Sequence, residues 1–113
     1  MKLITAVLRP AAFESVREAL AVFGARGLTV TTVYGTPAQD RRRVLVYRGQ
    51  QMTADLDPMV RLDLLTPDDE AADLIHVLAR AAGENADLTD RIWLTPVDLV
   101  VRIRTSEYGL DAL

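Results

Sequence analysis

The fold of this chain is decided by a stretch that occurs twice, as VLRPAAFESVREAL over residues 7–20 and as LLTPDDEAADLIHVL over residues 64–78. In each copy an apolar stretch meets a proline, an amphipathic helix follows, and a glycine (Gly24 or Gly83) ends the helix. A second strand-like stretch comes next. Two strand–helix–strand units in one small chain predict an α+β fold, a ferredoxin-like βαββαβ sandwich. Because a fold says little about function, function must lie in what the chain adds to these repeats.

Length and composition indicate one domain over residues 1–113, with half of the residues hydrophobic. The absence of cysteine excludes disulfides, thiolate zinc sites and a cysteine nucleophile. The apolar run before Arg9 is too short for a signal peptide or a membrane span. We therefore expect a cytoplasmic protein with no direct membrane insertion. The net charge of −3 is not the excess of positive charge that nucleic-acid binding proteins use to contact phosphates, so no nucleic-acid partner is expected.

The first unit reads as a strand over residues 3–8, a helix and a strand over residues 27–34. Pro10 suits the first turn of the helix, where a missing N–H costs nothing. Gly24 suits its end, because glycine readily takes a positive φ. An apolar stripe at helical spacing faces the core, made of Phe13, Val16, Leu20 and Phe23.

The second unit begins with a strand over residues 60–64 that has one polar face. Thr66 is predicted as the N-cap of the second helix, with Pro67 at its first position and Gly83 at its end. Core positions on that helix are Leu74, Ile75 and Leu78. Residues 92–104 are predicted to carry the last strands, with Leu99, Val101 and Ile103 on one face and Arg102 and Arg104 on the other.

A long excursion over residues 35–58 separates the second and third strands and exceeds a usual hairpin loop. It carries three consecutive arginines, Arg41, Arg42 and Arg43, which suit an acidic partner or simply a solvated loop tip. Residues 44–47 are apolar and suit a short strand or a contact with a neighbouring subunit, and Arg48 follows them. The tail over residues 105–113 is longer than a strand end requires.

Nearly end to end, these features resemble the P-II nitrogen-regulatory signal transduction proteins. The residues that carry the resemblance are the opening residues 1–6 with Arg9-Pro10, residues 16–20, residues 27–31, Tyr47-Arg48-Gly49, Pro67-Asp68-Asp69 and residues 102–105. In that family the excursion over residues 35–58 would be the T-loop, which reports to target proteins. The stretch over residues 83–91 would be the phosphate-holding B-loop.

The resemblance implies a homotrimer with an adenine nucleotide in clefts between subunits, so ADP, AMP and ATP are the candidate effectors. The nucleotide-binding positions would be Thr29, Gly35, Thr36, Gln39, Leu65, Arg91, Arg102 and Arg104. The T-loop positions facing a partner would be Arg41, Arg42, Arg43, Tyr47 and Arg48. Arg102 and Arg104, two apart on a strand, would point the same way and hold phosphate by forked hydrogen bonds. Two solvated arginines on an edge remain the alternative.

This sequence departs from the family pattern at the functional places. The B-loop-like stretch lacks the family's three glycines and carries three acids instead, Glu84, Asp87 and Asp90, which disfavour a polyphosphate. We therefore expect ADP or AMP to be preferred over ATP. Met59 replaces the lysine that pairs with 2-oxoglutarate. Met52 and Gln50 replace the tyrosine and serine that relatives modify, so neither position has an acceptor hydroxyl.

Other polar residues have structural explanations. His76 suits a helix surface, without a metal role. Trp93 suits a core or a subunit interface better than a ligand stack. Asp68-Asp69 suit a helix start, and Asp87 with Asp90 suit a solvated loop, so neither pair indicates catalysis. We therefore expect no enzyme, no catalytic residue and no metal site.

The leading interpretation is a P-II-like regulator that senses an adenine nucleotide or another small anion and acts on a partner through its long loop. The alternative is a trimeric, partner-binding scaffold with a degenerate pocket that binds nothing. A small hydrolase on the same sandwich lacks an evident nucleophile. A membrane transporter, a metabolic enzyme and a transcription regulator all remain open as the target.

Overall fold

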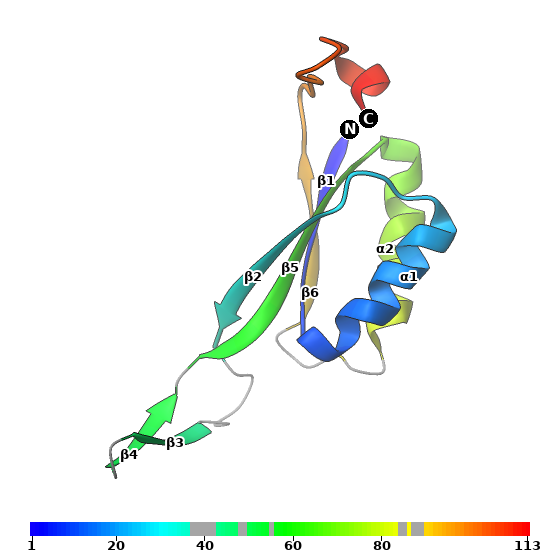
Figure 1. Cartoon of the computed structure of the whole chain (residues 1–113). Coiled ribbons are helices and arrows are strands. Elements are labelled where there is room, and N and C mark those ends of the chain that lie inside the picture. Colours follow the sequence, from blue (N-terminus) through cyan, green and yellow to red (C-terminus); the bar gives the residue numbers. More distant parts are fainter. Residues whose placement is uncertain (37–42, 48–49, 55, 84–85, 87–89) are drawn as a thin grey trace.

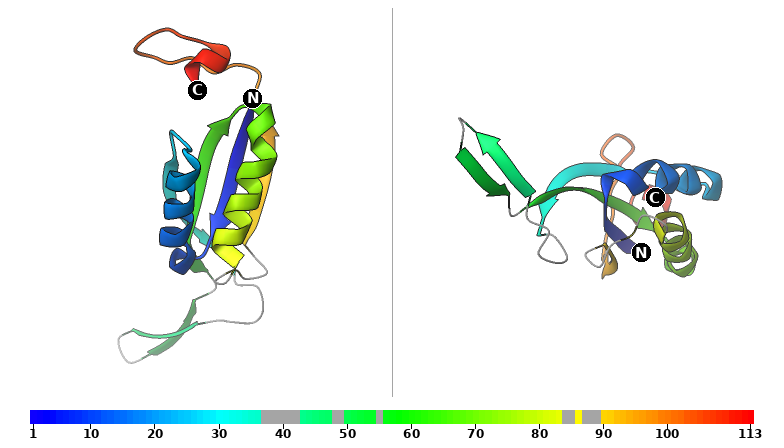
Figure 2. Two further views of the ribbon diagram at one scale, coloured as in Figure 1. Left: turned by 90° about the vertical axis from the view of Figure 1, so that its right-hand side faces the viewer. Right: turned by 90° about the horizontal axis from the view of Figure 1, so that it is seen from below.

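The computed structural model describes residues 1–36, 43–47, 50–54, 56–83, 86 and 90–113, with the backbone alone described for 43–47 and 50–54. A four-stranded antiparallel sheet carries two helices on one face, as the two views of Figure 2 show. The elements follow one another as β1 (Lys2–Leu8), η1 (Pro10–Ala12), α1 (Phe13–Phe23), β2 (Thr29–Gly35), β3 (Arg43–Tyr47), β4 (Gln50–Ala54), β5 (Asp57–Thr66), α2 (Asp68–Ala82), β6 (Arg91–Pro96) and η3 (Gly109–Ala112). The predicted ferredoxin-like sandwich is confirmed.

The sheet order is β2-β5-β1-β6, so the strands of the two repeated units alternate across the sheet. The longest strand, β5, pairs with β1 and β2 on its two sides, with Thr5 opposite Asp63 and Thr29 opposite Asp63. On the other side of β1, Thr5 faces Trp93 of β6. Paired residues share a face of an antiparallel sheet, so this register fixes which side chains lie under the helices and which do not.

The core lies between the helices and one sheet face. Its most enclosed members come from both layers: Ile4, Leu8, Leu62, Leu64, Val16, Leu74 and Leu78. The predicted stripe on α1 is confirmed, with Val16 and Leu20 buried and Phe13 and Phe23 partly buried against the core. We call the opposite sheet face, which no helix covers, the open face.

The predicted end of α1 is confirmed, but its start is not, because Pro10 begins the separate 3-10 turn η1 and α1 begins at Phe13. The predicted start of α2 also differs. Gly24 ends α1 in the left-handed region at φ 91°, as predicted. The N-cap of α2 is Pro67, not Thr66, because Thr66 ends β5 and is buried there. Its hydroxyl lies 3.2 Å from the Pro67 carbonyl and does not cap the helix. Gly83 follows the last helical residue with a right-handed φ of −55°, so its conformation does not require glycine.

The last strand is shorter than predicted. Strand β6 ends at Pro96, and the chain then turns back on itself as a projecting turn over residues 97–108. Val101 bridges Tyr108, the Arg102 N–H donates to the Glu107 carbonyl at 2.8 Å, and the Ser106 N–H donates to the Arg102 carbonyl at 2.9 Å. Ser106 takes a left-handed φ of 59° to close this turn. Figure 1 shows the turn beyond one end of the sheet, close to both termini.

At the other end of the molecule, strands β3 and β4 form a separate two-stranded sheet (Figure 1). The molecule is consequently elongated, 57 Å by 29 Å by 22 Å. The predicted short strand over residues 44–47 is confirmed as β3, whereas β4 was not predicted. Gln39, Arg41, Arg42 and Arg48 lie outside the described residues, as do Glu84 and Asp87.

Candidate functional site: the open face and two ends of the sheet

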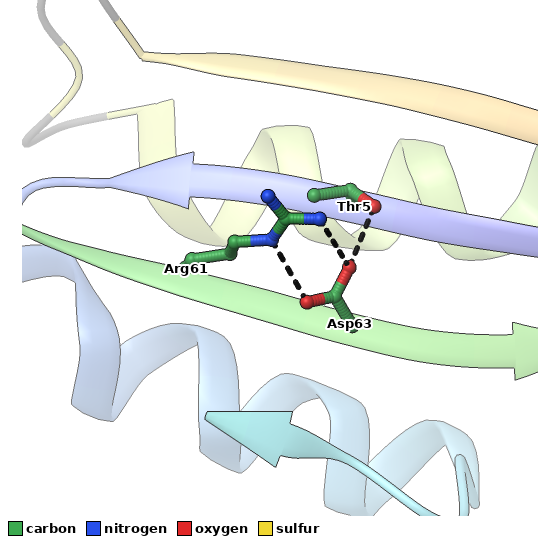
Figure 3. A network of polar contacts seen from close by, with 3 residues as sticks. All are labelled: Thr5, Arg61 and Asp63. Atoms are coloured by element: carbon green, nitrogen blue, oxygen red, sulfur yellow. Dashed lines mark hydrogen bonds and ion pairs between the residues drawn. The ribbon is translucent and has the colours of Figure 1, made fainter. Parts of the chain in front are cut away.

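A polar network lies on the open face, joining β1 and β5 (Figure 3). The Thr5 hydroxyl donates to Asp63 Oδ1 at 2.7 Å, although the two residues are 58 positions apart in sequence. Arg61 Nε donates to Asp63 Oδ2 at 3.0 Å, and the Arg61 guanidinium carbon lies 5.9 Å from the centre of the Trp93 ring. Thr5 is completely buried by this arrangement. Carboxylate, guanidinium, hydroxyl and indole thus form one ordered surface across three strands.

Electrostatics favour the ionised form of Asp63 in this network. Burial raises the pKa of the Asp63 carboxyl, but hydrogen bonds from Arg61 and Thr5 and the charge of Arg61 lower it by more. The net result is a pKa below the ordinary value of an aspartate. A carboxylate with two partners on one side is preorganised, so the network has a fixed charge pattern at neutral pH.

Three of the predicted nucleotide positions lie on or beside the β2–β5 edge of the open face. Thr29 pairs with Asp63, Leu65 is two residues further along β5, and Gly35 ends β2 opposite Asp57. Thr29 and Leu65 are exposed, and Thr36 follows Gly35 as an exposed residue. The fold therefore places Thr29 near Leu65 and leaves both side chains accessible.

Close packing against Met59 explains why a glycine suits position 35. A Cβ at this position would lie 3.2 Å from the Met59 side chain, which is closer than most real contacts of a Cβ. Met59 is itself 5% exposed. The residue that replaces the family's 2-oxoglutarate lysine is thus a buried apolar side chain that fills space beside Gly35. It offers no charge to a carboxylate ligand.

Arg91 lies elsewhere, at the start of β6 on the opposite edge of the sheet. It is exposed and, with Asp90, helps to line a cavity of about 230 Å³ between β6 and the end of α2. Other lining residues are apolar: Leu8, Ala79, Ala82, Ala86 and Ile92. One of the three acids predicted to disfavour phosphate therefore lies beside Arg91.

Arg102 and Arg104 are not on a strand, contrary to the prediction. Both are exposed on the projecting turn, where the chain reverses between Arg102 and Glu107. The same turn exposes apolar side chains, with Leu99 at 60%, Val101 at 54% and Ile103 at 97%. The expectation that Arg102 and Arg104 hold phosphate because they point the same way from a strand is therefore wrong. An alternating sequence cannot form a strand where the single chain supplies no neighbouring strand to pair with it.

The predicted nucleotide residues that the structure describes consequently fall into separate groups within one chain. From Arg91 to Pro96 strand β6 advances about 17 Å, at about 3.4 Å per residue, before the projecting turn begins. Arg91 and the pair Arg102 and Arg104 are thus at opposite ends of the sheet. On the other edge strand, β2, Thr29 and Gly35 lie at opposite ends, and Leu65 is on the neighbouring strand β5 near Thr29. One chain does not bring these residues around one small ligand.

A second cavity, of about 370 Å³, lies where the C-terminal segment returns to the body. Leu65 lines it, together with Arg26, Glu70, Leu110 and Leu113. Ala112 of η3 is buried nearby at 6% exposure. The tail over residues 105–113 is therefore partly a packed structural element, and among the described lining residues Leu65 is the one that was predicted to bind nucleotide.

Sequence reasoning missed the network of Thr5, Arg61 and Asp63. It identified only a polar face on β5, and no local pattern connects Thr5 to a residue 58 positions away. Trp93 is 40% exposed and stacks near Arg61, so it is not a core residue of the single chain, and its alternative role at a subunit interface stays a prediction. His76 lies on the exposed side of α2, as predicted.

Comparison with known proteins defines the class to which this fold and these residues belong, a class of regulatory proteins rather than of enzymes. Residues 1–107 match the family described as Nitrogen regulatory protein P-II. The chain is 36% identical over 113 residues to Nitrogen regulatory protein GlnK of Escherichia coli strain K12, with all of both chains covered. It is 35% identical to Nitrogen regulatory protein P-II of Rhizobium meliloti, again with full coverage of both.

The chain therefore belongs to the P-II family of nitrogen-regulatory signal transduction proteins. Within the described part of the chain, neither helix is long and apolar enough to cross a membrane. The same residues contain no cluster of histidine, aspartate or glutamate that would suit a metal ion.

Proposed function

We propose that this chain is a P-II-type regulator in which neighbouring copies of a homotrimer complete a cleft for an adenine nucleotide. The observation that carries the proposal is the separation of the predicted nucleotide residues, exposed at two ends of one sheet. A small ligand could contact both groups only if another copy supplied one of them. Closed cyclic assemblies join different surface patches of successive subunits in this way.

The apolar residues of the projecting turn support the same assembly. Leu99, Val101, Ile103 and Tyr108 are all more than half exposed in the single chain. An exposed apolar group of this kind, next to polar residues, is typical of an interaction surface. Docking of the turn on a neighbouring copy would cover these side chains and carry Arg102 and Arg104 to that copy.

The charges around Arg91 support a preference for ADP or AMP over ATP. Asp90 lies beside Arg91 at the cavity, and Glu84 and Asp87 precede it in sequence. Each added phosphate brings more negative charge toward these three acids, and such repulsion is strong in a partly buried site. Met59 is buried and uncharged, so we expect no 2-oxoglutarate response.

Isothermal titration calorimetry with ATP, ADP and AMP tests the nucleotide proposal. Arg104→Ala should weaken binding by about 1.5–3 kcal/mol, the usual contribution of a hydrogen bond to a charged group. Arg17→Ala is the matched control, because Arg17 is an exposed arginine on α1 that pairs with Glu14 at 2.8 Å. Tightest binding of ATP would contradict the charge argument.

Size-exclusion chromatography with light scattering tests the assembly. The expected mass is about three times the chain mass of 12.5 kDa. A clean monomer mass would contradict the shared cleft. Trimers that bind no nucleotide at millimolar concentration would instead favour the partner-binding scaffold, a function that buried Met59 and the acid beside Arg91 also suit.

The regulatory output, in this proposal, passes through residues 35–58 to a target protein, with Arg41, Arg42, Arg43, Tyr47 and Arg48 as contact residues. Replacement of residues 37–55 by a short glycine-serine linker should leave trimer mass and nucleotide binding unchanged and abolish regulation of the target. We also expect no nucleotidylation of this loop, since Met52 and Gln50 lack the hydroxyl group of their family counterparts.

A further inference from the structure

The β3–β4 sheet is the feature of this fold that the sandwich does not require. Within the described part of the chain, β3 and β4 pair with each other and with no third strand. An isolated two-stranded hairpin is only marginally stable in water, and three strands are usually needed for independent stability. Strand edges without a partner are also templates on which another chain can add a strand.

The register identifies the backbone groups that β3 offers to such a strand. Tyr47 and Gln50 are opposite each other across only two residues, so they form the hydrogen-bonded pair that closes the hairpin. Hydrogen-bonded and non-hydrogen-bonded pairs alternate along an antiparallel ladder. The pairs Val46–Gln51 and Val44–Thr53 are therefore non-hydrogen-bonded. Their N–H and C=O groups point outward, those of Val44 and Val46 along the free edge of β3.

Composition favours β3 over β4 as the edge that receives a strand. Strand β3 reads Arg-Val-Leu-Val-Tyr, whereas β4 reads Gln-Gln-Met-Thr-Ala. β-Branched and aromatic residues suit a strand that is paired on both sides. Strand β3 also contains no proline, which would remove a donor from its edge.

Charge determines what kind of strand suits this edge. Residues 41–54 contain four of the 13 basic residues of the chain and none of its 16 acidic residues. A second copy of this segment would carry four more arginines in its sequence, and like charges oppose that pairing. An acidic strand would be attracted. The rest of the chain has nine basic and 16 acidic residues, so this charge is specific to the segment.

We propose that β3 binds an extended, acidic segment of the target protein by adding it as a third strand to the β3–β4 sheet. The inference rests on the proposed function, in which this loop contacts the target, and it adds the mode of recognition. Main-chain hydrogen bonds to Val44 and Val46 would supply the pairing, and the arginines around β3 would select acidic sequences.

The test uses the full chain and a fluorescein-labelled ten-residue peptide that alternates glutamate and valine, with binding read as fluorescence anisotropy. Val46→Pro removes an outward N–H and should weaken binding by about tenfold or more. Gln51→Pro is the matched control, because Gln51 is opposite Val46 and its N–H points to the β4 edge. The control should bind as the unaltered chain does.

Two peptide controls keep the test independent of any effect of proline on folding. A peptide N-methylated at every amide has no backbone N–H left for the ladder, so it should not bind. A peptide with lysine in place of glutamate should not bind either, and binding of the acidic peptide should weaken at high salt. Equal binding of the N-methylated peptide would overturn strand addition, as would a Val46→Pro variant that binds unchanged.

The remaining outcomes separate this inference from the proposed function. If Arg43→Glu abolishes binding while Val46→Pro and N-methylation change nothing, recognition is by charge alone. The inference is then wrong, and a loop-mediated output remains. If the acidic peptide does not bind or the peptide-free chain forms higher oligomers through β3, the inference is also wrong. Nucleotide titration of the same preparation then decides the nucleotide cleft separately.

Discussion

The hydrogen bond between Thr5 and Asp63 is the interaction whose energy the structure defines best. Thr5 is completely buried, its hydroxyl is 2.7 Å from Asp63 Oδ1, and valine has nearly the same shape as threonine. A hydrogen bond to a charged acceptor contributes about 1.5–3 kcal/mol. Asp63 keeps its bonds to Arg61 and its side chain is 20% exposed, so we expect Thr5→Val to cost about 1.5 kcal/mol, near the lower limit.

Urea unfolding followed by tryptophan fluorescence measures this cost, because Trp93 is the only tryptophan and lies beside Arg61. In thermal unfolding, the melting temperature of Thr5→Val should be lower by about 6 °C, at about 4 °C per kcal/mol for a domain of this size. A double-mutant cycle with Asp63→Ala, which removes the acceptor oxygen, isolates the pair and should give a coupling energy of about 1 kcal/mol. Coupling below about 0.3 kcal/mol, the usual error of additivity, would refute the reasoning.

The pH dependence gives an independent check with a defined sign. The pKa of Asp63 is lower in the folded chain than the ordinary value of about 3.9. Its ionised form therefore contributes stability above that ordinary value, and the contribution is lost as pH falls through the folded-state pKa. The difference in the free energy of unfolding between the unaltered chain and Asp63→Asn should be largest at pH 7 and should decrease below about pH 4. A difference that grew on acidification would contradict the shift.

Further predictions concern backbone, core and assembly. Gly24→Ala should cost about 1 kcal/mol in chemical unfolding because φ is 91°, whereas Gly83→Ala at φ −55° should be neutral or stabilising, and equal costs would contradict this contrast. Leu78→Ala in the core should cost about 2–5 kcal/mol, while Val22→Ala, at a 90% exposed position, should stay within about 0.5 kcal/mol in the same assay. Ile103→Ser should leave the circular dichroism spectrum unchanged and weaken assembly in a light-scattering dilution series, whereas Val22→Ser should leave both unchanged. Identical dilution curves for both variants would exclude the projecting turn from the interface.

Much of the fold could be predicted because its signals are local. Gly24 marks the end of α1, and the apolar stripe of Val16 and Leu20 indicates its buried face, whereas Pro10 marks only the short turn η1 that precedes the helix. The prediction of Thr66 as the N-cap of α2 was wrong. Thr66 satisfies a local capping pattern, but its side chain is buried at the end of β5. Local sequence cannot weigh a cap against the burial that the neighbouring strand imposes.

The candidate site was less predictable because it depends on register and on other chains. The pairing of Thr5 with Asp63 needs strands that meet across 58 residues, and alternation alone does not give a register. The pattern around Arg102 and Arg104 is that of a strand, yet a strand needs a neighbour. In the single chain a turn closed by Ser106 takes its place.

The separation of Arg91 from Arg104 has a consequence for mixtures of altered chains. In the proposed cleft each subunit gives one part of the site to one neighbour and the other part to the next. A trimer made only of Arg91→Ala chains, or only of Arg104→Ala chains, would then have no intact cleft. Subunit exchange at equal mixing would restore about a quarter of the clefts. A cleft is intact when the subunit that gives Arg91 is an Arg104→Ala chain and the subunit that gives Arg104 is an Arg91→Ala chain, and each of these has a chance of about one half. Two proteins that each bind nucleotide weakly would thus regain strong binding only together.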